Sequence, residues 1–183
     1  MKLQKTFVIF GILAGTIGCD QATKVAARQH LEGQGTFSYL GDTFRLTYSE
    51  NYGAFLGLGS SLPEGVRTLI FVGIVAIGLI AFLIWLLRTS PLSKQFVVAS
   101  ALIIGGGIGN LIDRVIFEGG VTDFLNMGVG SIRTGIFNIA DVWIVAGVLL
   151  LALSPEFREG LSQPEDDVET ENQIPQGTGR PES

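Results

Sequence analysis

Apolar residues gather in four long runs that polar segments separate. The runs cover residues 6–27, 66–87, 96–117 and 136–153. The hydrocarbon core of a bilayer is about 30 Å thick, and a helix needs about 20 apolar residues to cross it. The second run carries no charge between Arg67 and Arg88. The pattern therefore predicts an all-α membrane protein with four transmembrane helices.

The long segment between the first two runs, residues 28–65, has a different pattern. Aromatic and aliphatic residues alternate with polar ones on both sides of Gly41-Asp42, which is typical of a β-hairpin with its turn there. An apolar, glycine-rich stretch from Phe55 to Leu62 is typical of a short interfacial helix. We expect a small hairpin or sheet and a short helix outside the membrane, with aromatic side chains at headgroup level.

The first run has a second interpretation, because it follows Lys2 and Lys5 and leads to Cys19, as in a lipoprotein signal peptide. Three further apolar runs follow in place of a soluble domain, so we favour a transmembrane helix in which Cys19 packs as a small residue. One cysteine and one histidine give no disulfide and argue against a zinc site.

Charged residues make up 16% of the chain, against about 25% in soluble domains. Lys2 and Lys5 precede the first run, and Arg88 and Lys94 lie between the second and third, which places these ends and both termini in the cytoplasm. Residues 154–183 hold eight of the 17 acidic side chains and predict a disordered cytoplasmic tail. The chain has no basic stripe of the kind that binds nucleic acid.

Glycines recur in the third run, at Gly105-Gly106-Gly107 and Gly109. Small residues at these spacings let helix backbones approach closely. We favour this role over a phosphate-binding loop, because no Walker lysine follows.

Ionisable residues inside a membrane span are costly and mark candidate functional sites. Asp20 and Lys24 lie four residues apart near the end of the first run, where a structural ion pair is at least as strong an interpretation as a direct role. Asn110, Asp113 and Arg114 share one helical face at the end of the third run.

Further polar residues lie at the ends of the spans or between them. Asn138 and Asp141 open the fourth run, where Asn138 could also be a plain helix cap with Asp141 as an acid of the first turn. Asp123 precedes them, and Asn51 and Gly53 lie in the long loop. The predicted topology brings all these residues to the outer face of the membrane. Two poorly solvated carboxylates there would share a proton, as in aspartic proteases.

Five ordered motifs now carry a resemblance to a known family. They are Asp20-Gln21-Ala22-Thr23-Lys24, Asn51-Tyr52-Gly53-Ala54-Phe55, Gly105 through Arg114, Val121-Thr122-Asp123-Phe124 and Phe137-Asn138-Ile139-Ala140-Asp141. The chain resembles lipoprotein signal peptidase (signal peptidase II, aspartic peptidase family A8) up to about Leu153. The resemblance implies a catalytic pair and two further groups. The pair is Asp123 and Asp141; the substrate-binding residues are Asn51, Gly53, Asn110, Arg114 and Asn138; the supporting residues are Asp20, Lys24 and Asp113.

The resemblance also implies an activity. The family consists of bacterial inner-membrane aspartic endopeptidases that cleave diacylglyceryl-modified prolipoproteins on the N-terminal side of the lipidated cysteine. We expect lipidated prolipoproteins, membrane lipids and globomycin-type inhibitors as partners, and no metal, cofactor or nucleic acid.

Two other classes of protein remain open from the residues alone. Intramembrane carboxylates also carry ions in transporters and proton-conducting proteins. Against this, the polar residues form one layer and none crosses the second run. A non-catalytic assembly protein is the third possibility.

Overall fold

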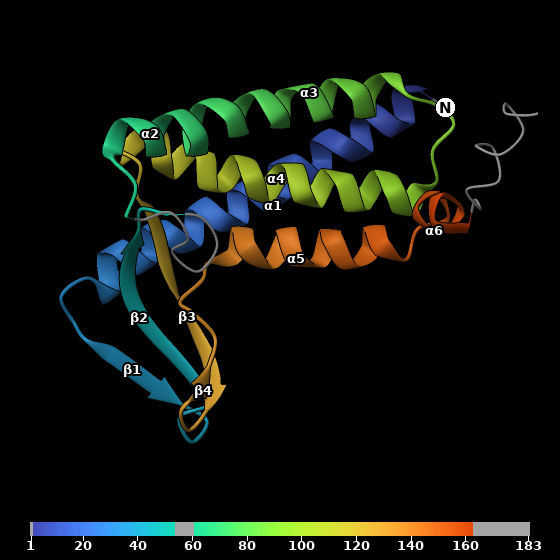
Figure 1. Cartoon of the computed structure of the whole chain (residues 1–183). Coiled ribbons are helices and arrows are strands. Elements are labelled where there is room, and N and C mark those ends of the chain that lie inside the picture. Colours follow the sequence, from blue (N-terminus) through green and yellow to red (C-terminus); the bar gives the residue numbers. More distant parts are fainter. Residues whose placement is uncertain (1, 54–60, 163–183) are drawn as a thin grey trace, which may run out of the picture.

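The computed structural model describes residues 2–53 and 61–162. Its helices lie side by side in a bundle: α1 (Lys2–Leu31), α4 (Lys94–Ile116), α5 (Ile139–Ala152), and a segment that runs without a break through α2 (Glu64–Thr68), the π-helical η2 (Leu69–Ile74) and α3 (Val75–Arg88) (Figure 1). Each predicted apolar run is helical, so the helical bundle is confirmed.

The helices differ in how well they suit a membrane. Within the described ranges, three helical segments are long and apolar enough to cross one: residues 3–31, 64–88 and 94–116. α5 is equally apolar but has 14 residues. It begins at Ile139, later than predicted, because Asn138 caps it in an extended conformation. The count of four spans therefore stays a prediction.

A four-stranded antiparallel sheet lies at one end of the bundle, and the chain's N-terminus and the α3–α4 connection lie at the other (Figure 1). The strands are β1 (Thr36–Tyr39), β2 (Phe44–Asn51), β3 (Val121–Val129) and β4 (Ile132–Arg133), in the order β1-β2-β3-β4. The predicted hairpin is confirmed: Gly41 and Asp42 adopt φ of 62° and 70° in the β1–β2 turn.

Strand β3 was not predicted. It pairs with β2 so that Asp123 lies opposite Ser49, and β4 returns to pair with its far end. This strand completes the sheet and carries Asp123.

Two predictions concern the margins of the described residues. All but the last two residues of the predicted interfacial helix, 55–62, lie outside the described ranges. The sequence predicts a disordered tail from residue 154 onwards, but its first residues form a helix, α6 (Pro155–Ser162). Ser154 accepts from Phe157 N at its start and Pro155 occupies the first turn, which are ordinary helix-start features. Residues 163–183 lie outside the described ranges.

The glycines of α4 lie at close helix contacts, as predicted. A Cβ at Gly106 would lie 2.5 Å from Ala140 O of α5, and a Cβ at Gly109 would lie 2.6 Å from Asp20 Oδ2 of α1. In α1, by contrast, a Cβ at Gly18 would meet no described atom within 4 Å. The close approach of α1 and α5 to α4 brings the polar ends of these three helices together.

Candidate functional site

Asp123 lies on β3, next to the helix bundle, and is 2% exposed. Its Oδ1 accepts from Asn138 Nδ2 at 2.6 Å and its Oδ2 accepts from Asn51 Nδ2 at 3.0 Å. Burial raises the pKa of Asp123 to about 6, and the nearby charge of Asp141 adds to that rise. The carboxyl group is therefore positioned to hold a proton close to neutral pH.

Asp141 lies in the first turn of α5. Its Oδ2 accepts from Asn138 N at 3.1 Å, while Asn138 Oδ1 accepts from Asp141 N at 3.1 Å, which is a capping box. The other oxygen, Oδ1, accepts from Asn110 Nδ2 at 2.9 Å. The capping interpretation of these two residues is thus correct, and it leaves one carboxylate oxygen of Asp141 directed at α4.

Two asparagines link the carboxylates. Asn138 Nδ2, which donates to Asp123, also donates to Asn110 Oδ1 at 3.0 Å. Asn110 in turn donates to Asp141. The hydrogen-bonded path runs from Asp123 through Asn138 and Asn110 to Asp141, and it joins β3, α4 and α5.

A buried cation supports this path from the side. Lys24 Nζ lies 2.8 Å from Asn110 Oδ1, 2.8 Å from Asp20 Oδ2 and 3.4 Å from Asp113 Oδ2. The side chains of Lys24, Asp20 and Asp113 are all fully buried. The predicted ion pair of α1 exists, and Lys24 also contacts a residue that touches Asp141.

The two acids of this cluster bind backbone as well. Asp20 Oδ1 accepts from Ala140 N at 2.9 Å, and Asp113 Oδ2 accepts from Thr122 N at 3.0 Å. These bonds attach α1 to the start of α5 and α4 to β3, one residue before each candidate catalytic carboxylate. Gln21 was not predicted as a site residue, although it lies in the first motif. Its Nε2 donates to Asp113 Oδ1 at 3.0 Å and to Gly109 O at 3.1 Å.

Arg114 closes the site on the side of the long loop. Its Nη2 donates to Gly53 O at 2.6 Å and its Nη1 to Asn110 O at 3.2 Å. Gly53 N donates to Asn51 Oδ1 at 2.9 Å, which folds the loop back towards Asp123. Arg114 Nε is buried and has no hydrogen-bond partner in the described part of the chain. All ten predicted site residues therefore form one cluster, either directly or through a shared partner.

Two apolar cavities are lined by Asp141, and they also share Val145 and Leu149 of α5. The first, of about 420 Å³, lies between α3, α4 and α5, and Asn110, Arg114 and Phe71 line it with Asp141. The second, of about 360 Å³, is lined by Asp141, Phe137 and the adjoining strip of α5 that carries Val142 and Ala146. Among the described residues, no group of three or more His, Cys, Asp or Glu side chains is placed to hold a metal ion.

Comparisons with known proteins match most of the chain. The sequence profile of a family described as signal peptidase (SPase) II matches residues 12–156. The lipoprotein signal peptidase of Syntrophus aciditrophicus is 36% identical over 154 residues, which cover 82% of this chain and 94% of that protein. The lipoprotein signal peptidase of Sphingopyxis alaskensis is 38% identical over 151 residues, 79% of this chain and 84% of that protein.

Two solved bacterial membrane enzymes are similar in structure. One has a TM-score of 0.72 and 25% identity, and the match covers 94% of both chains. The other has a TM-score of 0.67 and 28% identity, with 80% of this chain and 90% of that chain covered.

Proposed function

Because the chain belongs to the signal peptidase II family, a family of peptidases, and carries membrane-embedded apolar helices, we propose that it is an aspartic endopeptidase. Its proposed substrates are diacylglyceryl-modified bacterial prolipoproteins, cleaved on the N-terminal side of the lipidated cysteine. The observation that carries this proposal is the path from Asp123 through Asn138 and Asn110 to Asp141. A buried acid and a half-buried acid with amide donors between them suit a pair that shares one proton.

The proposed reaction uses both carboxyl groups and one water. The ionised Asp141 takes a proton from water as the water oxygen attacks the scissile carbonyl carbon. Asp123, whose raised pKa supports its holding the shared proton, gives that proton to the carbonyl oxygen. The tetrahedral gem-diol then collapses: Asp141 gives its proton to the departing amine of the cysteine as the C–N bond breaks. Asp123 takes a proton back from one hydroxyl group as the product carboxyl group forms. No covalent enzyme intermediate forms, and we propose no metal or cofactor.

The asparagine amides keep the two carboxyl groups in their orientations. Asn110 Oδ1 accepts from both Lys24 and Asn138, so its NH₂ group must face Asp141. We assign Lys24 as a positioning residue that acts through Asn110. The buried Nε of Arg114, in the cavity wall beside Asp141, is available to a backbone carbonyl of the substrate.

The cavities fit the two apolar parts of such a substrate. A prolipoprotein has an apolar signal segment on one side of the scissile bond and diacylglyceryl chains on the other. The two cavities adjoin along α5, and Asp141 lines both. We propose that one holds the signal segment and the other the acyl chains, which brings the bond between them to the carboxylates. Globomycin-type inhibitors would compete for the same space.

The proposed location is the bacterial inner membrane, with four spans and both termini in the cytoplasm. The start of α1, the end of α3 and the start of α4 lie at the end of the bundle opposite the sheet (Figure 1). These segments carry Lys5, Arg88 and Lys94, which supports a cytoplasmic assignment for that end. The sheet and both carboxylates then lie at the outer face. α5 spans about 21 Å at 1.5 Å per residue. The residues on either side of α5 would have to cover the remaining thickness of the membrane.

The test is cleavage of a purified lipidated prolipoprotein, followed by the shift in its mobility on a gel. We expect Asp123→Asn and Asp141→Asn each to lose about a thousandfold or more in rate, as the removal of acid–base groups does. Glu118→Gln, an exposed acid at the end of α4, is the matched control and should keep full activity. Retained cleavage by either Asn variant would overturn the pair. Proton flux through the protein in liposomes would instead favour the conducting alternative.

A further inference from the structure

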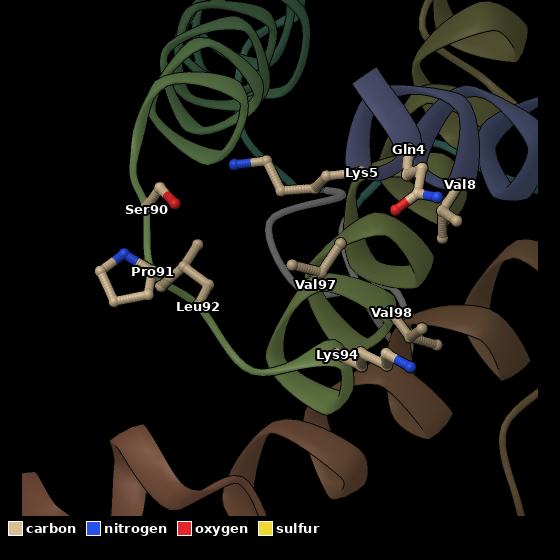
Figure 2. A pocket seen from close by; sticks show the side chains of 9 residues that line it. All are labelled: Gln4, Lys5, Val8, Ser90, Pro91, Leu92, Lys94, Val97 and Val98. Carbon is tan, nitrogen blue, oxygen red and sulfur yellow. The ribbon is translucent and has the colours of Figure 1, made fainter. Parts of the chain in front are cut away.

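A separate cavity of about 300 Å³ lies at the opposite end of the bundle from the carboxylates. It is formed by the first turns of α1 and α4 and by the segment that joins α3 to α4 (Figure 2). Val8, Leu92, Val97 and Val98 give it apolar walls. Nothing in the proposed reaction uses this cavity.

Two cations and no acid line the cavity: Lys5 and Lys94. Lys5 Nζ donates to Leu86 O and Thr89 O, both at 2.7 Å, which leaves one of its three N–H groups. Lys94 is exposed and has no hydrogen-bond or ion-pair partner among the residues that the structure describes.

One acid lies near the cavity without lining it. Glu156 of α6 accepts from Ser93 N at 2.5 Å and from Ser93 Oγ at 2.8 Å. The side chains that line the cavity itself carry two positive charges and no negative one.

The charged and apolar groups are layered along the helix axes. Lys5 and Lys94 lie at the starts of α1 and α4, while Val8, Val97 and Val98 lie about one turn further along each helix. A phospholipid has the same order, with a charged phosphate at the membrane surface and acyl chains below it. Basic pockets between membrane helices bind anionic head groups.

We propose that this cavity is a binding site for an anionic phospholipid of the surrounding membrane. The phosphate lies against Lys94, Lys5 adds a second positive charge to the cavity wall, and the upper part of one acyl chain lies against the valines. This site is independent of the proposed peptidase function. A bound lipid there would hold the starts of α1 and α4 together.

The experiment is native mass spectrometry of the full chain in detergent. The probes are palmitoyl-oleoyl phosphatidylglycerol and phosphatidylcholine with the same chains. We expect the wild-type protein to retain the anionic lipid more strongly than the zwitterionic one. Lys94→Gln should weaken binding of phosphatidylglycerol about fivefold, the effect of one lysine at a membrane surface.

The matched control is Arg88→Gln, which removes an exposed cation from the same end of the bundle but does not line the cavity. It should leave phosphatidylglycerol binding within about twofold of wild type. An equal loss in both variants would show surface attraction alone and would overturn the site, as would equal retention of the two lipids.

A second variant tests the apolar part. Val8→Trp adds a large ring at the half-exposed wall of the cavity and should reduce the retention of both lipids. Thermal unfolding of the same preparation, at a temperature close to that of the wild-type protein, reports that the variant is folded. Unchanged retention by a folded Val8→Trp protein would remove the cavity from the proposal.

Discussion

Asn138 Nδ2 donates to Asp123 Oδ1 at 2.6 Å. The other end of the same amide, Oδ1, caps α5 by accepting from Asp141 N. Since an amide has one acceptor and one donor end, the cap determines which end faces Asp123. The residue that starts the helix thereby also orients the strand carboxylate.

Two substitutions of Asn138 separate its role as the cap of α5 from its role as the hydrogen-bond donor to Asp123. Serine caps helices as well as asparagine does, whereas alanine costs about 1 kcal/mol at such a position. Neither can donate an amide N–H to Asp123. We expect Asn138→Ser and Asn138→Ala to lose kcat equally, by about tenfold to a hundredfold. Thermal unfolding in detergent should rank the alanine variant below the serine variant. Full activity in the serine variant would mean that the cap alone matters.

The raised pKa of Asp123 makes folding stability depend on pH. The folded protein binds this proton more tightly than the unfolded chain, so its contribution is fully present below about pH 4. It is lost as the pH rises through about 6, and a rise in pKa from 3.8 to about 6 corresponds to about 3 kcal/mol.

We therefore expect the unfolding temperature of the wild-type protein to fall between about pH 4 and about pH 7 by more than that of Asp123→Asn. Tryptophan fluorescence during heating measures both. Other acids titrate in both proteins, so the difference between the two curves isolates Asp123. Parallel curves would contradict a raised pKa at this position.

Two variants separate the role of Lys24 in orienting Asn110 from its role in the ion pair with Asp20. Removing it alone leaves Asp20 buried and uncompensated, whereas Asp20→Asn combined with Lys24→Met removes the pair together. If Lys24 orients Asn110, the double variant should regain thermal stability over Lys24→Met. Its kcat should still be about tenfold below wild type with KM little changed. Recovery of kcat along with stability would make Lys24 purely structural.

Helix packing next to the site gives a prediction for two glycines. A Cβ at Gly109 would lie 2.6 Å from Asp20 Oδ2, in the cluster that holds α1 against α4. Gly109→Ala should destabilise the protein by about 1–3 kcal/mol through overpacking. Gly18→Ala is the control, because its Cβ would meet no described atom within 4 Å. Equal unfolding temperatures for the two variants would contradict the close packing.

The sequence predicted what depends on local pattern. Hydropathy located the helices, and alternation around Gly41-Asp42 located the hairpin, because both signals lie in neighbouring residues. Strand β3 was missed because its partner β2 lies about seventy residues earlier, and nothing local specifies that pairing or the register shift between Leu46 and Ser49.

The candidate site shows the same division. Helical spacing predicted that Asn110, Asp113 and Arg114 share a face, and topology predicted that the polar ends of the spans meet. The direction in which each amide points was not predictable. Asn110 Oδ1 faces Lys24 only because three helices pack closely enough to bring α1 beside α4 and α5. The start of α6 was not predicted for a simpler reason. Its capping residue, Ser154, precedes an acidic, polar segment whose composition is typical of disorder.

The ion pair of α1 has a consequence for biosynthesis. Asp20 and Lys24 lie on the same helix, with Lys24 Nζ 2.8 Å from Asp20 Oδ2, so the pair needs no second helix to form. An unpaired charge inside a bilayer costs several kcal/mol. α1 can thus enter the membrane with this pair of charges already neutralised, without waiting for α4. When α4 then packs against α1, Lys24 already lies at the depth in the membrane at which it contacts Asp113 and Asn110.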